Sequence, residues 1–326
     1  MAWHKTSISH DSSWVGFEME LEHPRFKVAK EKLQIITDDL GGWLEGKHIK
    51  ALDIHKTVSR VQWATAACPT AKPFLQPLWA WMMAVSKTGG APSILVRHIA
   101  TMLKKMLSEP WKPDIKEHTV AKWTGASDAS CRVDRSGIGG WIYDTSQPTS
   151  KSDVYWFMEK FEVEDRDKWL FHGATPQERV AAMELFGTLM LLEVLWGKMD
   201  LPSSHKMYLK AATDNQGNSI SIYNAKTKAW PSSIILMQIV WSAHHMNLEL
   251  GIEHEFRENN EWADQLAGGD ATGFDPDKRL KPSMETSKWD LLSIFTSAEV
   301  LKSALSSQKR RKKKKGPLNG ILKSHN

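Results

Sequence analysis

The sequence has few cysteines and no long apolar run. Only Cys68 and Cys131 occur among 326 residues, which excludes a disulfide framework, and the pair lacks the spacing of a metal site. We therefore expect a protein of a reducing compartment. No stretch of about eighteen apolar residues is present, and the start, MAWHKTSISHDSSW, lacks the apolar core of a signal peptide. We expect neither a membrane-spanning nor a secreted protein.

The body of the chain also lacks the positive charge that the net value of +5 suggests. The run KRRKKKK, Lys309 to Lys315, carries seven positive charges, so the remainder sums to 5 − 7 = −2. The basic character belongs to a tail. Such a run is typical of a nuclear localisation signal that binds an import receptor, of a non-specific grip on phosphates, or of a solvated charge block.

What is present indicates three zones. The length suggests about two domains, and 41% apolar residues can build cores. Residues 1–120 combine aromatic residues with helical periodicity interrupted by prolines, which predicts a mainly helical region. Residues 121–272 alternate strand-like and helix-like patterns, which predicts a mixed α/β domain. Residues 273–326 are rich in proline and lysine, with one possible helix near 287–305, and predict a largely flexible tail.

The middle zone predicts a definite order of elements. A β-hairpin with arms near 122–130 and 138–143 precedes an alternating segment, DVYWFMEKF, and a long apolar helix from about Pro176 to Lys198. The strand KMYLKAAT, helices near 216–226 and 232–248, the short strand GIEHEF and a last helix from Asn260 follow. Glycines at 137, 139 and 140 favour a hairpin turn and close approach of backbones.

Four carboxylates hold unusual positions on these elements. Asp128 lies within the first strand, where a branched or aromatic side chain is usual. Glu184 lies on the apolar helix, where a buried charge needs a partner, and Glu193 would face the opposite side of that helix. Asp214 follows a strand directly, where α/β sheets place ligands, and Asp264 lies one helical turn after Asn260.

The order of these motifs resembles the ribonuclease H domain of reverse transcriptases, especially those of retrotransposons. SDASCRVDRSGIGGW resembles that family's first two strands, MELFG its helix-borne glutamate, and ATDNQGN its third acidic motif. HEFRENNEWADQLA is similar to the closing element. The resemblance covers about 150 residues and implies a ribonuclease H-like α/β fold, a five-stranded mixed sheet flanked by helices.

This resemblance also implies chemistry. Asp128, Glu184, Asp214 and Asp264 would converge, and such repelling carboxylates are tolerable mainly when cations lie between them. Oxygen ligands favour Mg²⁺ or Mn²⁺, and two ions can promote in-line phosphodiester hydrolysis. The expected activity is hydrolysis of the RNA strand of an RNA–DNA hybrid.

Five further residues could have supporting roles, and the resemblance implies the role of one of them, His254. His254 would handle protons or help metal and product to leave; the alternative is a surface histidine. Short polar side chains beside the acids could contact phosphates, sugars or the 2′-OH of RNA, or could be capping residues. These residues are Ser130, Asn215, Gln216 and Asn260.

The first zone resembles the thumb and connection region of reverse transcriptases. SSWVGFEMELEHPRFKVAKEKLQIITDDL is similar to the strand and helix that follow the polymerase palm, and SRVQWATAACPTAKPFLQPLWAW is similar to the thumb and connection. The paired aspartates of a palm should lie before WVGF and are missing there, because the pair Asp38 and Asp39 falls after WVGF in a helical context. We expect no DNA synthesis by this chain.

Three functions remain open at this point. The first is the metal-dependent hybrid ribonuclease, derived from a retroelement that lacks its palm here. The second is an inactive nucleic-acid-binding remnant that grips a duplex without cutting it. The third is a transposase or integrase of similar fold, which is disfavoured because its last acid is typically a glutamate on a helix. The tail favours a nuclear location, and the cytoplasm is the alternative.

Overall fold

The computed structural model describes residues 11–14, 16–20, 25–108, 119–132, 135–147, 149–162, 176–198, 207–255, 260–283 and 289–296. The chain divides into two compact units, Met1–Ser283 and Met284–Asn326. The basic run Lys309 to Lys315 lies outside the described residues. This division falls elsewhere than the domain borders that we expect from the sequence, near residues 120 and 272. Those borders remain predictions.

The N-terminal region combines a small sheet with helices. The strands β1, β2 and β3 pair antiparallel in that order. The elements are β1 (Asp11–Trp14), β2 (Phe17–Glu20), β3 (Arg25–Val28), α1 (Lys30–Leu44), α2 (Ala51–Ala64), the 3₁₀ helix η2 (Pro69–Phe74), α3 (Leu75–Ala84) and α4 (Ile94–Ser108). Leu40, Trp43, Ile54 and Leu103 are almost fully buried, so these helices have their own apolar core.

The second region of this unit begins at β4 (Thr119–Val120). Its elements are β5 (Trp123–Cys131), β6 (Arg135–Asp144), β7 (Tyr155–Glu162), α6 (Pro176–Trp196), β8 (Met207–Thr213), α7 (Gln216–Tyr223), α8 (Ser232–His245), β9 (Leu248–His254), α9 (Glu261–Gly268) and the 3₁₀ helix η4 (Pro276–Lys278). The other unit contributes the short helix α10 (Leu292–Thr296). The order matches the elements predicted from the sequence.

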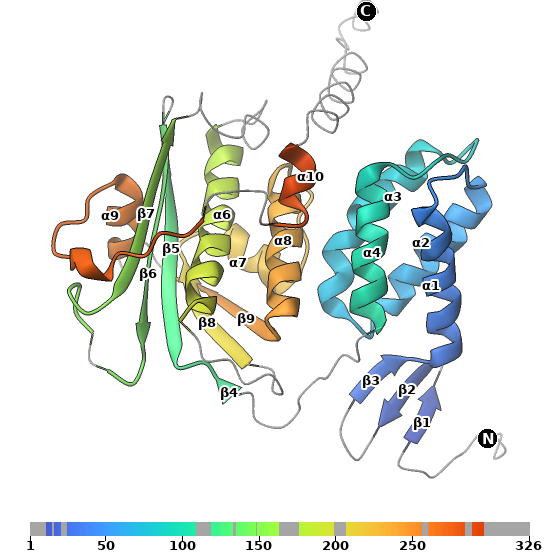
Figure 1. The fold of residues 1–326 in the computed structure, drawn as a ribbon, viewed down its shortest axis with the longest axis horizontal. Helices are drawn as coiled ribbons and strands as arrows, with labels where there is room; N and C mark the ends of the chain where they lie inside the picture. Colours follow the sequence, from blue (N-terminus) through green and yellow to red (C-terminus); the bar gives the residue numbers. More distant parts are fainter. Residues whose placement is uncertain are drawn as a thin grey trace, which may run out of the picture. The chain divides into compact units, whose positions relative to one another are not determined.

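The predicted ribonuclease H-like sheet is confirmed by its strand order. The five main strands lie in the order β7-β6-β5-β8-β9, and β4 adds a two-residue pairing to the start of β8. β6 runs antiparallel to both β5 and β7, whereas β5, β8 and β9 are parallel. In chain order this is 3-2-1-4-5, a mixed sheet whose first strand lies at the centre (Figure 1).

Helices cover both faces of this sheet (Figure 1). α6, α7 and α8 lie on one side, and α9 lies on the other. The segment from Ala182 to Leu192 of α6 is buried throughout, because the helix is enclosed by β5 and β6 on one side and α8 on the other. A helix that is apolar all round is expected in such a place.

Glycines allow α9 to lie directly against β6. A Cβ atom added to Gly139 would stand 2.3 Å from the Ala267 nitrogen, and one added to Gly137 would stand 2.3 Å from the Ala267 oxygen. The close backbone approach expected of these glycines is confirmed. The hairpin turn itself falls before them, after Arg132.

The chain after α9 packs back onto β7. Phe274 is buried with Val154, Trp156 and Leu266. The Trp156 indole nitrogen donates to the Asp275 carbonyl oxygen over 2.7 Å, and the Leu280 nitrogen donates to the Trp156 carbonyl oxygen over 2.7 Å. This ordered segment was not expected from its sequence, in which we placed the start of the tail at residue 273.

Within the described part of the chain, we find no helix whose length and apolar character would let it cross a membrane.

We predict that Gly139→Ala destabilises the protein. The new methyl group would meet the backbone of α9, which cannot move without disturbing the packing of Leu266, so we expect a loss of about 1–3 kcal/mol or more in the free energy of unfolding. Urea denaturation measures this. Gly42→Ala is the matched control, because nothing lies within 4 Å of that site in α1 and the change should stabilise by about 0.5–1 kcal/mol. Equal effects of the two substitutions would contradict the close contact.

Candidate metal centre

The candidate site lies where two parallel strands separate. β5 and β8 pair through Gly125 with Ala211 and through Ala126 with Ala212, and the pairing stops there. Asp128 lies two residues beyond Ala126, and Asp214 lies two residues beyond Ala212. The two carboxylates therefore stand on either side of an opening at the carboxyl ends of parallel strands, where α/β sheets usually bind ligands.

A third carboxylate reaches this opening from α6. Asp128, Glu184 and Asp214 each have a carboxylate oxygen within 4.8 Å of those of the other two. Asp128 is 4% exposed and Glu184 is 7% exposed, so water screens their charges poorly. Glu193, on the far side of the same helix, instead accepts a hydrogen bond from the Ser283 nitrogen over 3.1 Å.

Burial raises the pKa of Glu184 to about 8. Loss of hydration is the main cause, a hydrogen bond from Asn215 opposes it, and the charges of Asp128 and Asp214 raise it further. Without a cation, this carboxyl group therefore holds a proton at neutral pH. A bound cation would remove both the repulsion and the proton.

Two amide groups hold the Glu184 side chain in place. The Asn215 amide nitrogen donates to Glu184 Oε2, and the Asn218 amide nitrogen donates to the same oxygen over 3.1 Å. Asn218 also donates to the Ala181 carbonyl oxygen over 3.0 Å, and its backbone N–H donates to Asn215 Oδ1, which caps α7. The first turn of α7 thus fixes the orientation of Glu184.

Asn218 is the functional residue that the sequence did not reveal. It is 4% exposed and lies inside α7, where an isolated asparagine in a sequence looks like a solvent-facing residue. The one usable signal is its position three residues after Asn215, the spacing of a capping interaction. That spacing predicts the cap and not the contact with α6.

The two other predicted catalytic residues lie on other elements, and His254 has a direct contact with a member of this group. Asp264 is half-buried in the first turn of α9, on the opposite face of the sheet from α6, and is not part of the close group of three. His254 ends β9, and its Nε2 lies 3.1 Å from the Asp214 carbonyl oxygen. Because a carbonyl oxygen only accepts, Nε2 carries the proton in this contact.

The side chains predicted to contact substrate differ in exposure and in the hydrogen bonds that they already make. The Asn215 amide is used by Glu184, whereas Gln216 is exposed at the start of α7 and Ser130 is half-buried on β5. Asn260 is 1% exposed at the start of α9, makes no side-chain capping bond, and among the described residues has no hydrogen-bond partner for its amide nitrogen or oxygen. A buried amide without partners costs about 1–3 kcal/mol, and a ligand would offset that cost only by reaching this buried side chain.

The three acidic side chains suit a hard divalent cation. Asp214 Oδ1 is buried and has no hydrogen-bond partner among the residues that the structure describes, as expected of an oxygen that a cation would contact. Carboxylate oxygens without sulfur ligands favour Mg²⁺ or Mn²⁺ over zinc. Cys131 is nearby on β5, but burial raises the pKa of its thiol and keeps it neutral.

Comparisons with known proteins add structural likeness only. No protein-family model matches the sequence, and no curated protein matches it. The RNase H1 structure from the halophilic archaeon Halobacterium salinarum is 15% identical, with a TM-score of 0.32, over 45% of this chain and 94% of that one. LC11-RNase H1, in complex with an RNA/DNA hybrid, is 17% identical with a TM-score of 0.35, over 46% and 96%.

A longer likeness involves a foamy viral protease-reverse transcriptase, whose structure holds an RNA/DNA hybrid. It is 7% identical with a TM-score of 0.27, over 75% of this chain and 29% of that one. These values carry no argument about activity. The fold assignment depends on the strand order and register described above.

The raised pKa of Glu184 predicts how metal-free stability depends on pH. Between its ordinary value of 4.5 and about 8, the folded protein keeps a proton that the unfolded chain releases. The stabilisation is complete below pH 4.5 and is lost as pH rises towards 8. Glu184→Gln should remove up to roughly 5 kcal/mol of this dependence, since one pKa unit is about 1.4 kcal/mol.

Urea denaturation in EDTA at a series of pH values measures the effect. Glu193→Gln is the matched control on the same helix, and it should keep the wild-type dependence. If Glu184→Gln and the wild type lose stability in parallel between pH 5 and pH 8, the buried proton is absent.

We predict that Asn218→Leu weakens metal binding, because it removes one of the two donors that orient Glu184 while keeping the size of the side chain. Loss of such an outer contact typically costs about 10–100-fold in metal affinity. Titration with Mn²⁺, followed by electron paramagnetic resonance, measures the affinity. Asn224→Leu, at the exposed end of the same helix, is the control. Unchanged Mn²⁺ affinity in a folded Asn218→Leu protein would refute the role.

Proposed function

We propose that this chain is a metal-dependent nuclease that hydrolyses the RNA strand of RNA–DNA hybrids. The observation that carries the proposal is the convergence of Asp128, Glu184 and Asp214 at the opening between β5 and β8. A cluster of buried carboxylates destabilises a protein without a cation, so its presence favours a catalytic use.

Each residue of the site has a proposed part. Asp128, Glu184 and Asp214 would hold Mg²⁺ or Mn²⁺, with Asp264 approaching from α9. When bound, two such ions supply a nucleophile at neutral pH and neutralise the leaving oxygen. His254, on the rim beside Asp214, would receive or deliver protons there.

Substrate contacts would come from both sides of the opening. Ser130, Gln216 and Asn260 offer hydroxyl and amide groups to the sugar, where a 2′-OH distinguishes RNA from DNA. Arg132 and Arg135 flank the β5–β6 hairpin at this end of the sheet, and both are exposed. Guanidinium groups there suit the phosphates of a bound duplex.

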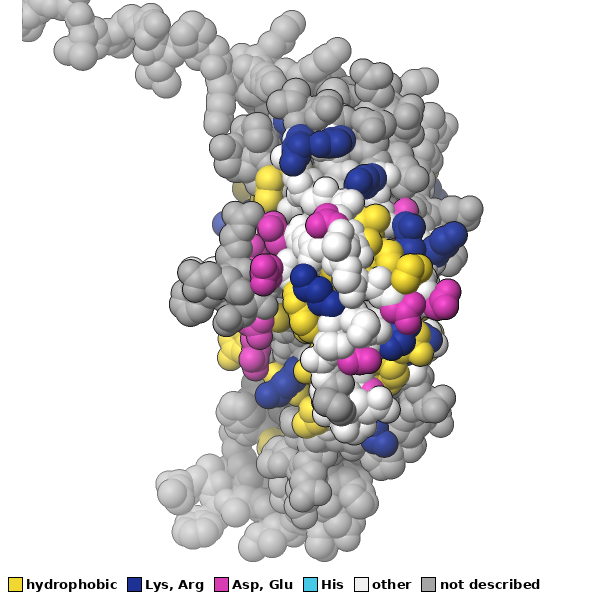
Figure 2. Space-filling model, turned by 90° about the vertical axis from the view of Figure 1, so that its left-hand side faces the viewer, with side chains coloured by type: hydrophobic (Ala, Val, Ile, Leu, Met, Phe, Trp, Pro, Cys, Tyr) yellow, Lys and Arg dark blue, Asp and Glu magenta, His cyan; other side chains and the backbone are white. Residues whose placement is uncertain are grey.

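The face that carries α9 and β7 is less suited to a duplex. Among its described residues, Lys and Arg side chains alternate with Asp and Glu (Figure 2). Mixed charges of this kind give no continuous basic track along the backbone of a nucleic acid. We place the hybrid at the end of the sheet that carries the acids.

We also propose an evolutionary origin for this chain and a location in the cell. We infer that residues 1–120 derive from the thumb and connection region of a retroelement reverse transcriptase, and that residues 121–272, with the segment up to Ser283 that packs onto β7, form the nuclease domain. The basic run would direct the chain to the nucleus through an import receptor.

Cleavage of a labelled RNA–DNA hybrid in Mg²⁺ tests the activity. Asp128→Asn should abolish cleavage, because one negative ligand is lost, while metal-free thermal stability holds or rises as repulsion is relieved. Asp53→Asn on α2 is the control and should cut normally. Cleavage by Asp128→Asn would refute the assignment, and binding of the hybrid without cleavage by the wild type would favour the inactive remnant.

The tail has its own test. If the basic run contacts about 4–6 phosphates, the affinity for hybrid should fall steeply with salt, and deletion of residues 306–318 should flatten that slope without changing the cleavage chemistry. Fusing the same residues to a cytoplasmic reporter tests nuclear import. An unchanged salt slope after the deletion would contradict phosphate binding by the basic run. A reporter that stays cytoplasmic would contradict its role as an import signal.

A further inference from the structure

The segment that follows α9 passes from one face of the sheet to the other. We call this segment, residues Asp270–Ser283, the C-terminal strap, and Figure 1 shows it running from α9 past β7 towards α6. Gly269, with a φ of 91°, turns the chain out of α9 just before the strap begins. At the far end, the Ser283 nitrogen donates to Glu193 Oε1 on α6 over 3.1 Å. The strap thus contacts both helices that carry predicted catalytic acids.

Gln265 joins α9 to the strap, and it directly follows Asp264 in the chain. Its amide nitrogen donates to the Thr272 carbonyl oxygen over 3.0 Å and to Asp270 Oδ2 over 3.1 Å. Its amide oxygen accepts a hydrogen bond of 2.6 Å from the Lys151 ammonium, in the connection between β6 and β7. Both N–H groups and the oxygen of this amide are therefore engaged. A side chain held in this way restrains the rotation of the helix that carries it.

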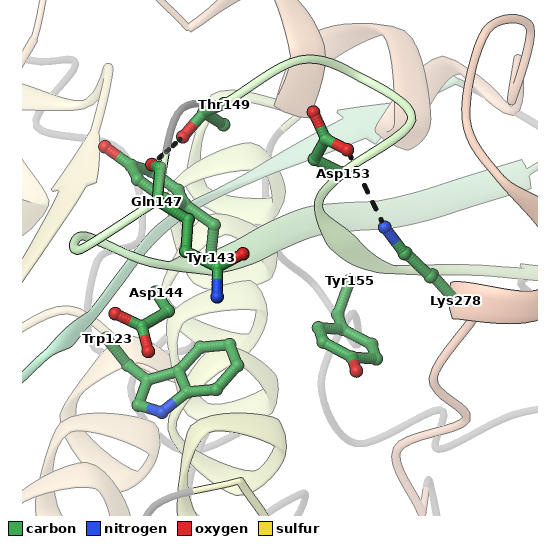
Figure 3. Close-up of a pocket in the computed structure, with 8 residues that line it drawn as sticks. All are labelled: Trp123, Tyr143, Asp144, Gln147, Thr149, Asp153, Tyr155 and Lys278. Carbon is green, nitrogen blue, oxygen red and sulfur yellow. Dashed lines mark hydrogen bonds and ion pairs between the residues drawn. The ribbon is translucent and has the colours of Figure 1, made fainter.

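The middle of the strap is fixed to the edge strand β7. An isolated parallel bridge pairs Arg279 with Trp156, and the Arg279 guanidinium donates to the Met158 carbonyl oxygen over 2.8 Å. The Lys278 ammonium lies 3.9 Å from Asp153, and Figure 3 shows this pair at the rim of a pocket. The strap therefore covers part of the outer edge of the sheet and is held there by backbone and side-chain contacts.

The contact between α9 and the sheet makes such anchoring necessary. α9 (Glu261–Gly268) has eight residues, and a helix this short has little stability of its own. It lies on the backbone of β6, where Gly137 and Gly139 present no side chains that could interlock with it. A contact of this kind resists compression and resists sliding or rotation much less. Asp264, in the first turn, would move with the helix.

We propose that the strap and Gln265 position Asp264 at the metal centre. Asp264 is not a member of the close group of three acids, so its distance from a bound cation depends on where α9 lies. Gln265 is a positioning residue in this proposal, because its side chain is directed to the strap and acts through its neighbour. The inference rests on the proposed metal-dependent function.

A double-mutant cycle with Mn²⁺ tests the proposal on the full chain. Gln265→Leu removes the amide and keeps the approximate size of the side chain, and it should weaken Mn²⁺ binding about tenfold, as loss of an outer contact typically does. In an Asp264→Ala background the same substitution should have almost no effect, because the carboxylate that it positions is already gone. Electron paramagnetic resonance measures both affinities. Gln62→Leu, at an exposed site on α2, is the matched control and should leave the affinity unchanged.

Lys151→Met provides a second variant at the surface. It removes the donor to the Gln265 oxygen and keeps the length of the side chain, so it should weaken Mn²⁺ binding severalfold, again only when Asp264 is present. It replaces Gln265→Leu if that variant does not fold, which circular dichroism establishes. A substitution that merely loosened the protein would weaken Mn²⁺ binding in both backgrounds.

Two results would overturn the proposal. These are an equal loss of Mn²⁺ affinity with and without Asp264, and an unchanged affinity in a folded Gln265→Leu protein.

Hybrid cleavage separates this inference from the nuclease proposal. Gln265→Leu should lower kcat about tenfold with KM unchanged, because the metal centre and not hybrid binding is affected. If the wild type cuts no hybrid, the proposed activity fails, and the Mn²⁺ cycle still decides the role of the strap. If the wild type cuts and the cycle shows no dependence on Asp264, the strap proposal alone fails.

Discussion

Repulsion among buried carboxylates is the constraint on which the rest of the second region depends. Asp128, Glu184 and Asp214 are brought within a few ångströms, where water barely reaches the first two and the third is half-buried. Such an arrangement is unfavourable without a cation, so other parts of the fold must hold it. The buried α6 supplies rigidity, and the cap of α7 supplies two donors to Glu184. The end of pairing between β5 and β8 supplies the space.

Much of this frame could be predicted from sequence, because the signals are local. The alternation of the hairpin, the apolar length of α6 and the strand before Asp214 each define an element without knowledge of its neighbours. Asp128 and Glu184 were conspicuous because each is a charge in an apolar context. The resemblance of these motifs to the ribonuclease H domain then implied the mixed sheet, which the register confirms.

Features that depend on contacts between distant segments could not be predicted in this way. The bonds from Asn218 to both Ala181 and Glu184 join segments more than thirty residues apart. The packing of Phe274 on Trp156 is of the same kind, and nothing in a stretch rich in proline and lysine indicates it. Of the small sheet β1–β3 only a single strand was expected, through the resemblance, since four-residue strands give only a weak periodic pattern.

The glycines of β6 show how a mutation could disturb the site without changing any acidic residue. Gly137 and Gly139 set the spacing between the sheet and the helix that carries Asp264, and neither site has room for a side chain. Drift at either codon would push that helix outward while every acidic residue stayed in the sequence. An intact set of carboxylates is therefore not sufficient evidence that the geometry around Asp264 is kept, and these two glycines should be considered together with the acids.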